Sequence, residues 1–119
     1  MTTYKKNVSE PWFSLIKLKL KTVEGRLNKG EFSNMKLGDI IIFTNDELGF
    51  ERSIDVKIIK IINYNTFQTY LENETLKRCL PGIDTIEEGV NIYYNIYKKE
   101  DIESKTVKAI TFTRMYYNA

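Results

Sequence analysis

The N-terminal part of the chain changes from a helical to an alternating pattern of hydrophobic positions. Phe13, Ile16 and Leu20 stand at i, i+3 and i+7 after Pro11, a residue that suits a first helical turn. The spacing then changes to a period of two, which continues through "TVEGRL" at residues 22–27. The pattern therefore predicts a short helix that leads directly into a strand.

Three further segments have the pattern of strands. Residues 37–43 ("LGDIIIF") end in an apolar run, which predicts a buried strand. Residues 53–63 ("SIDVKIIKIIN") and 106–115 ("TVKAITFTRM") alternate apolar and polar positions, as strands with one buried face do. Residues 28–36 ("NKGEFSNMK") predict a turn or a brief helix.

Helical spacing returns in the second half of the chain. Residues 66–80 ("TFQTYLENETLKRCL") predict one helix, which ends before the Pro-Gly pair at 81–82. A second helix is predicted over residues 85–97, with Asp84 or Thr85 as its cap, and Thr85 and Glu88 stand in capping-box register. The order of helix, strands, helices and strand predicts an α+β fold, a small mixed β-barrel with helices packed on it.

Length and composition favour an intracellular globular protein. A chain of 119 residues, 42% hydrophobic and 29% charged, suits one domain over residues 1–119. No run approaches the ~18 apolar residues of a membrane helix, and the N-terminus lacks the apolar region of a signal peptide. The single cysteine, Cys79, excludes an internal disulfide and suits a reducing compartment. We therefore expect a cytoplasmic protein without a membrane partner.

The chain contains no histidine. The usual nitrogen and sulfur ligands of a zinc site are therefore missing, and so is the base of a Ser-His-Asp or Cys-His nucleophile. We expect no metal site and no cofactor. Any catalysis has to use Lys, Glu, Asp, Tyr, Thr or Ser.

Positive charge is concentrated near the N-terminus. Residues 1–30 hold seven Lys or Arg and two Glu, a net charge of +5. Residues 31–119 hold eleven Lys or Arg and fourteen acidic residues, a net charge of −3. This segregation favours a polyanionic partner such as nucleic acid, although surface lysines that fall early in the chain by chance give the same count.

The segment "KTVEGR" places three charged residues close together. Glu24 and Arg26 share one face of the predicted strand, about 7 Å apart, so their side chains can pair. In a partly buried cleft this pair would fix the guanidinium for a phosphate or a base edge. On an open surface it would be a solvated ion pair worth ~0–1 kcal/mol. Lys21 precedes the strand, so alternation does not fix its direction.

Aromatic residues supply further candidates. Trp12, the only tryptophan, begins the first predicted helix and either stacks on a base or caps the core. Tyr93 and Tyr97 stand at i and i+4 in the second-half helix. We expect these two side chains to pack on the barrel and Tyr94 to be more exposed.

The order of elements and the charged segment together resemble the ASCH domain, a family with a PUA-like β-barrel fold related to RNA-binding PUA modules. The resemblance extends over about residues 8–113, in "PWFSLIK", "KTVEGRL", "LGDIIIF", "LPGID", "IEEGVNIYYNIY" and "AITF". The family signature is Gly-x-Lys-x-x-Glu-x-Arg, and Lys21, Glu24 and Arg26 match its last three fixed positions. Lys19 stands where the family has glycine.

The resemblance implies several possible activities. Some ASCH members resemble RNA-binding or coactivator-associated modules, some cleave RNA, and one bacterial branch hydrolyses acetylated cytidine. That amidohydrolase branch has a Lys, a Thr three residues later and a distant Glu. Lys21 fits this pattern, but Glu24 stands in place of the Thr. The distant Glu is expected near Gly82, with Asp84 close by.

Two functions are therefore expected for one cleft. The first is an RNA- or nucleotide-binding module in which Glu24 and Arg26 meet a base edge or phosphate, Trp12 stacks, and Lys17 and Lys19 follow the RNA backbone. The alternative is a hydrolase acting on RNA or a modified nucleoside. Lys21 would then be the base or electrostatic stabiliser, and Glu24 the proton shuttle. A protein-interaction adaptor is a third possibility.

Overall fold

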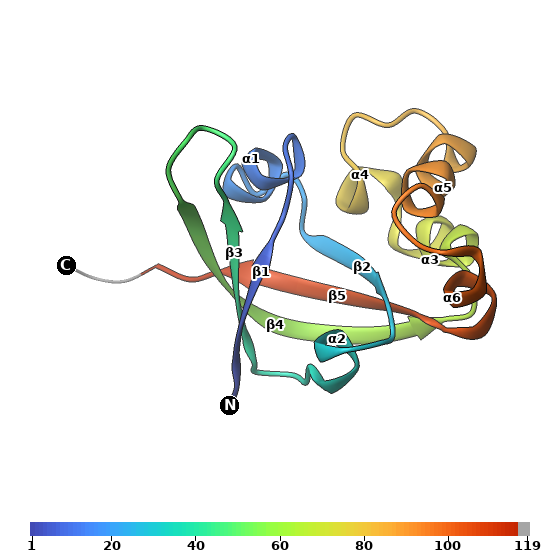
Figure 1. Cartoon of the computed structure of the whole chain (residues 1–119), viewed down its shortest axis with the longest axis horizontal. Helices are drawn as coiled ribbons and strands as arrows, with labels where there is room; N and C mark the ends of the chain where they lie inside the picture. The colour runs from blue at the N-terminus through green and yellow to red at the C-terminus, as the bar shows by residue number, and fades with distance from the viewer. Residues whose placement is uncertain (117–119) are drawn as a thin grey trace.

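Five strands form one mixed sheet that curls into a half-barrel (Figure 1). The computed structural model describes residues 1–116. The strands are β1 (Thr3–Asn7), β2 (Val23–Leu27), β3 (Ile40–Asn45), β4 (Arg52–Tyr64) and β5 (Val107–Arg114). The sheet order is β1-β3-β4-β5-β2, in which β1 and β3 are parallel and all other neighbours antiparallel. The expected α+β class, with a mixed barrel-like sheet and helices packed on it, is confirmed.

Six helices accompany this sheet in the part of the chain that the structure describes. They are α1 (Trp12–Lys17), α2 (Glu31–Asn34), α3 (Phe67–Glu74), α4 (Leu76–Cys79), α5 (Ile86–Tyr94) and α6 (Lys99–Ser104). Helices α3 to α6 gather at one end, where α3 and α4 pack on β2, whereas α1 contacts β3 (Figure 1). Within residues 1–116, no helix has both the length and the apolar character needed to cross a membrane.

Two hydrophobic clusters hold these layers together. One lies under α1 and includes Phe13, Ile16, Phe43, Val56 and Phe112. The other lies under α3 to α5 and includes Val23, Leu27, Phe67, Tyr70, Leu71 and Tyr93. Trp12 packs against both clusters, so the start of α1 stands at their boundary.

The single helix predicted over residues 66–80 is wrong, because the chain breaks it at Thr75. This residue has a φ of 76° and ends α3, with its N–H donating to the Leu71 carbonyl. Its side-chain oxygen then accepts from the Arg78 N–H at 3.4 Å and so caps α4. Threonine hydroxyls compete with helical backbone bonds in this way, and apolar spacing alone does not reveal the break.

Two elements were not predicted. Strand β1 has only one buried side chain, Tyr4, and is stabilised by its parallel pairing with β3, so its own pattern is too short to indicate a strand. Helix α6 has no buried residue, so no buried face distinguishes it in the sequence from the end of the preceding helix. That preceding helix, α5, ends earlier than predicted, at Tyr94, but its expected cap is confirmed. The Thr85 side chain accepts from the Glu88 N–H at 3.1 Å.

Candidate functional site

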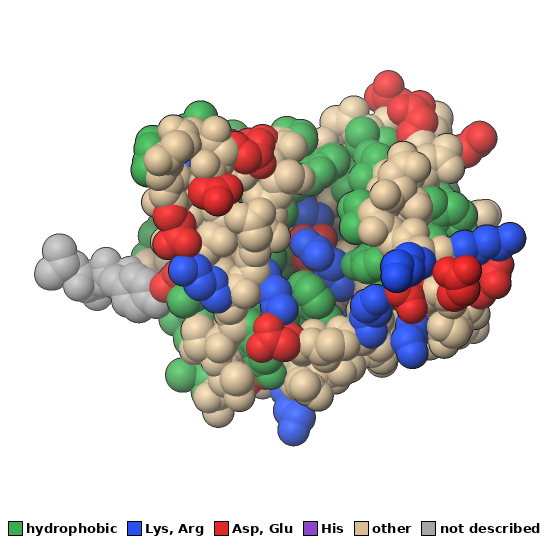
Figure 2. Space-filling view, viewed as in Figure 1, with side chains coloured by type: hydrophobic (Ala, Val, Ile, Leu, Met, Phe, Trp, Pro, Cys, Tyr) green, Lys and Arg blue, Asp and Glu red, His purple; other side chains and the backbone are tan. Residues whose placement is uncertain are grey.

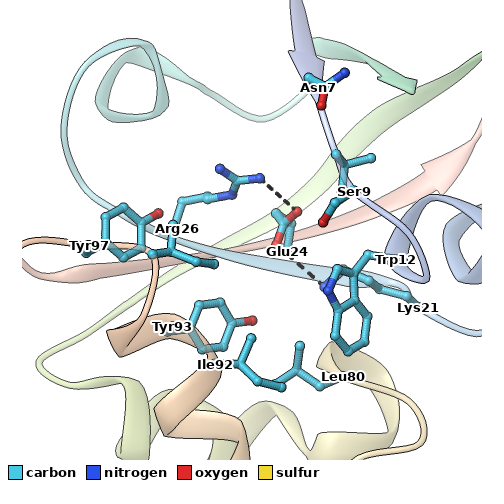
Figure 3. A pocket seen from close by; sticks show the side chains of 12 residues that line it. Asn7, Ser9, Trp12, Lys21, Glu24, Arg26, Leu80, Ile92, Tyr93 and Tyr97 are labelled. Atoms are coloured by element: carbon cyan, nitrogen blue, oxygen red, sulfur yellow. Dashed lines mark ion pairs between the residues drawn. The ribbon is translucent and has the colours of Figure 1, made fainter. Parts of the chain in front are cut away.

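A cavity of about 300 Å³ opens between α1 and the group of helices at the far end of the sheet. Figure 2 shows this hollow in the middle of the face, with Lys and Arg side chains inside it. Residues from both hydrophobic clusters contribute to its walls. The charged and aromatic side chains that line it are Trp12, Lys21, Glu24, Arg26, Tyr93 and Tyr97 (Figure 3).

Strand β2 places Glu24 and Arg26 in the cavity, because alternate side chains of a strand lie on the same face. Val23 and Leu27 point into the hydrophobic cluster under α3, and Glu24 and Arg26 line the cavity. Pairing with β5 fixes this register, because Glu24 lies opposite Ile110. The predicted common face of Glu24 and Arg26 is confirmed.

Lys21 reaches the same cavity from the loop before β2, and its ammonium is held by three oxygens. It donates to the carbonyls of Val23 at 2.7 Å and Cys79 at 2.5 Å, and lies 3.5 Å from Glu24 Oε1. The residue is only 2% exposed. An ammonium has three N–H donors and no lone pair. In this arrangement Lys21 ties its loop to α4 and places a positive charge beside Glu24.

Glu24 is a buried carboxylate between two cations. Its Oε1 lies 3.5 Å from Lys21 Nζ, and its Oε2 lies 3.5 Å from Arg26 Nη2. The residue is 4% exposed, so the alternative interpretation as a solvated surface ion pair is wrong. Burial by itself would raise the pKa of Glu24, but the charges of Lys21 and Arg26 outweigh it and lower the pKa below its ordinary value. The carboxylate is therefore ionised at neutral pH.

Arg26 is the more accessible cation of the set. Its side chain is 25% exposed, and its guanidinium lies 4.9 Å from the centre of the Phe32 ring. Burial would lower the pKa of Arg26, but the Glu24 carboxylate outweighs this and raises it. The guanidinium is thus a permanent donor at the cavity surface.

Aromatic rings form the walls around these charges. The Trp12 ring lies 6.0 Å from Lys21 Nζ, and the Tyr93 ring stacks on Phe67 at 4.4 Å between centroids. Tyr93 is buried and Tyr97 half-buried, whereas Tyr94 is exposed, as predicted. Trp12 packs on the core, one of its two expected roles, and it also lines the cavity; stacking on a base stays a prediction.

The other predicted lysines lie elsewhere. Lys17 and Lys19 are exposed, and neither lines this cavity. Lys19 instead borders a smaller hollow of about 160 Å³, together with Arg114 and Tyr116. Its ammonium lies 4.7 Å from the centre of the Tyr116 ring. The residues predicted to bind RNA therefore do not all line one cavity, and Lys21 lines both hollows.

Several lining residues were not singled out from the sequence. Asn7 is the last residue of β1, and Ser9 lies two residues beyond it. The pattern of this strand is too short to predict the strand from the sequence. Ile92 and Ile96 also line the cavity. They stand at i and i+4 beside Tyr93 and Tyr97, so the helical spacing of this region contained a usable signal.

The ASCH domain family matches residues 7–115 of the chain. The protein belongs to the ASCH family. ASCH domains have a PUA-like fold and are often linked to RNA binding. The family resemblance seen in the sequence is therefore confirmed over nearly the whole chain.

Two solved structures are similar to this ASCH protein. The crystal structure of hypothetical protein PH0355 is 34% identical with a TM-score of 0.84, covering 95% of this chain and 99% of that chain. The solution NMR structure of protein PF0455 from Pyrococcus furiosus is 35% identical with a TM-score of 0.77, covering 97% and 99%. No match was found among curated proteins.

This ASCH protein departs from the amidohydrolase pattern of the family at the expected positions. Glu24 occupies the position of the Thr nucleophile. Gly82 and Asp84, near the expected position of the distant Glu, are exposed and do not line the cavity.

Lys19 occupies the glycine position of the ASCH signature and adopts a backbone conformation that favours glycine. Its φ is 64°, in the left-handed region. The loop after α1 therefore keeps the turn that a glycine would make, with a lysine in its place. Such a conformation is strained for a residue with a Cβ.

We expect Lys19→Gly to leave the free energy of unfolding unchanged or slightly higher. Relief of the positive φ offsets the greater freedom of glycine in the unfolded chain. Lys17→Gly is the matched control, because Lys17 is helical and glycine there costs up to about 1 kcal/mol. Urea denaturation measures both variants. A larger loss for Lys19→Gly than for Lys17→Gly would contradict strain at Lys19.

Proposed function

We propose that this ASCH protein binds single-stranded RNA and holds one unstacked base in the cavity formed by Lys21, Glu24 and Arg26. The observation that carries the proposal is the convergence of these three charged groups in one cavity with aromatic walls. Proteins that recognise single-stranded RNA commonly stack bases on aromatic rings and bind their edges with polar groups. The half-buried Trp12 supplies such a ring here.

The charge of the cavity supports an anionic ligand. Lys21 and Arg26 carry two positive charges against the one negative charge of Glu24. The N-terminal 30 residues, which supply all three, have a net charge of +5. An RNA strand that places a base in the cavity brings its phosphates close to this surface.

The hydrogen bonding of Lys21 favours binding over hydrolysis. A lysine that acts as a base or nucleophile needs a free lone pair, and the Lys21 ammonium is directed at two carbonyls and a carboxylate. Glu24, with its lowered pKa, is poorly suited to donate a proton near neutral pH.

RNA affinity is expected to fall with salt and to depend on Arg26. Neutralising ~3 phosphates gives a slope of about −2 in a plot of log affinity against log salt. Arg26→Ala should weaken binding about 10-fold, because it removes the accessible cation of the cavity. Fluorescence anisotropy with a labelled single-stranded RNA of mixed sequence measures both effects.

Arg52→Ala is the matched control for Arg26→Ala. Arg52 also pairs with a glutamate, Glu10 at 3.0 Å, and its side chain is 20% exposed, but it does not line the cavity. Its loss should leave RNA affinity unchanged. Binding that is absent at low salt, or equally weakened by both variants, would contradict the proposal. Turnover of RNA or acetylated cytidine that is lost in Lys21→Ala would favour the hydrolase instead.

A further inference from the structure

The Glu24 carboxylate lines the cavity with its hydrogen-bonding capacity largely unfilled. Each oxygen lies 3.5 Å from its cation, whereas a charge-assisted hydrogen bond is about 2.7–2.9 Å long. The side chain is only 6% exposed, and it lines the cavity. A buried carboxylate is costly unless close donors surround it. A ligand that brings N–H groups to Glu24 would supply what its two cations do not.

Glu74, another buried glutamate, shows what a satisfied carboxylate looks like in this chain. Its side chain is 3% exposed. Arg78 Nη2 donates to its Oε1 at 3.1 Å, and the Tyr64 hydroxyl makes a short hydrogen bond to its Oε2. Both oxygens of Glu74 thus have close partners, and Glu74 does not line the cavity. The looser contacts of Glu24 are therefore a feature of the cavity rather than of burial.

The two oxygens of a carboxylate are suited to two parallel N–H donors. Among the four standard RNA bases, only guanine has adjacent N–H donors on its Watson–Crick edge, at N1 and at the 2-amino group. Adenine and cytosine offer one amino group there, and uracil offers one imino N–H. Guanine is thus the base that can satisfy both oxygens of Glu24.

Arg26 complements the third group on the guanine edge. The O6 carbonyl stands next to N1 and requires a donor. Arg26 Nη2 faces Glu24 Oε2, and a guanidinium has five N–H donors, so further donors remain for an oxygen beside that carboxylate. Figure 3 shows Arg26 and Glu24 side by side, with the Trp12 and Tyr93 rings near them. The half-buried Trp12 ring offers a surface on which a purine can stack.

We infer that the cavity is selective for guanine, with Glu24 accepting from N1–H and the 2-amino group and Arg26 donating to O6. The inference rests on the proposed function in taking this cavity as the base site. It adds the identity of the base and the residues that read it. Uracil and adenine are rejected because each leaves at least one oxygen of Glu24 without a donor.

The test compares nucleoside 5′-monophosphates by isothermal titration calorimetry with the wild-type protein. Guanosine monophosphate should bind most tightly. Inosine monophosphate is the matched ligand, since it keeps N1–H and O6 and lacks only the 2-amino group. It should bind about 10-fold more weakly, the scale for losing a hydrogen bond to a charged group. 1-Methylguanosine monophosphate, which lacks N1–H, should lose at least as much. Equal affinities across the series would overturn the inference.

Glu24→Gln tests whether Glu24 makes the distinction. The amide replaces one acceptor by a donor, so the preference for guanosine over inosine monophosphate should fall to about 1. Glu74→Gln is the control, a buried glutamate outside the cavity, and should keep the preference. The ligand series alone decides the matter if Glu24→Gln does not fold.

Failure of this inference and failure of the proposed function give different results. RNA binding that depends on Arg26, combined with equal affinity for all monophosphates, would overturn guanine selectivity and keep the proposed function. Selective binding of guanosine monophosphate without RNA binding would support the inference and replace RNA by a free nucleotide. Absence of both would overturn both.

Discussion

Glu24→Ala should lower the free energy of unfolding by about 3–5 kcal/mol. The substitution leaves Lys21 buried without its carboxylate, and removing one partner of a buried ion pair typically costs this much. Arg26 loses the same partner, although its partly exposed side chain can turn toward water. Urea denaturation followed by circular dichroism measures the change.

Glu31→Ala is the control that separates the effect of burial from the effect of a short distance between the charged atoms. Glu31 pairs with Lys6 at 2.6 Å, closer than either ion pair of Glu24 at 3.5 Å, but its side chain is 59% exposed. Solvated pairs contribute only ~0–1 kcal/mol, so this loss should be small. A Glu24→Ala variant as stable as Glu31→Ala would contradict the account of a buried, charged cavity.

The pairing of Glu24 with Lys21 and Arg26 also predicts how stability depends on pH. The folded pKa of Glu24 lies below its ordinary value of 4.5, so its stabilising contribution is complete above pH 4.5. That contribution is lost as the pH falls through the folded pKa. The difference in stability between wild type and Glu24→Gln should therefore shrink on acidification below about pH 4.5. A difference that stays constant down to the acid transition would mean that Glu24 is not stabilised as an anion.

Alternation and helical spacing predicted most of the fold because each element buries one regular face. Strand β4 and the face shared by Glu24 and Arg26 follow directly from a period of two. Strand β1 escaped prediction because its stability comes from pairing with β3 rather than from its own pattern. The break at Thr75 escaped because apolar spacing continues across it.

The position of Lys21 depends on contacts that no local pattern contains. Its side chain is held by the carbonyl of Cys79, 58 residues away in the sequence. Only the packing of α4 against β2 brings that carbonyl within reach. Lys19 lies two residues earlier, contacts the Tyr116 ring and lines the smaller hollow but not the cavity. The turn between α1 and β2 thus gives Lys19 and Lys21 different surroundings, although they are close in the sequence.

Gly25 supports the cavity from the opposite side of β2, where the Tyr70 ring packs against the strand. A Cβ at Gly25 would lie 2.3 Å from Tyr70 Cζ and 2.5 Å from its hydroxyl oxygen, closer than real Cβ contacts. Tyr70 is fully buried, and its hydroxyl meets that of Tyr93 at 3.1 Å. Glycine is therefore required between Glu24 and Arg26 so that β2 can lie directly on this ring.

Gly25→Ala should lower the free energy of unfolding by about 3 kcal/mol, at the upper end for overpacking, because the added Cβ would overlap a fully buried ring. Urea denaturation measures the loss. Gly89→Ala is the control, since its Cβ would meet the flexible end of Leu71 at 2.8 Å and alanine favours the helix. Its cost should be clearly smaller.

A double-mutant cycle with Tyr70→Leu decides whether this ring is the cause. Tyr70→Leu alone should destabilise the core, but Gly25→Ala should then cost much less, because the atoms that the Cβ meets are gone. Additive losses would mean that Gly25 is required for another reason, such as backbone conformation. A large coupling would show that the surface carrying Glu24 and Arg26 is set by a glycine-to-ring contact beneath it. In that case Gly25→Ala should also weaken RNA binding, because displacing Tyr70 moves its partner Tyr93 in the cavity wall.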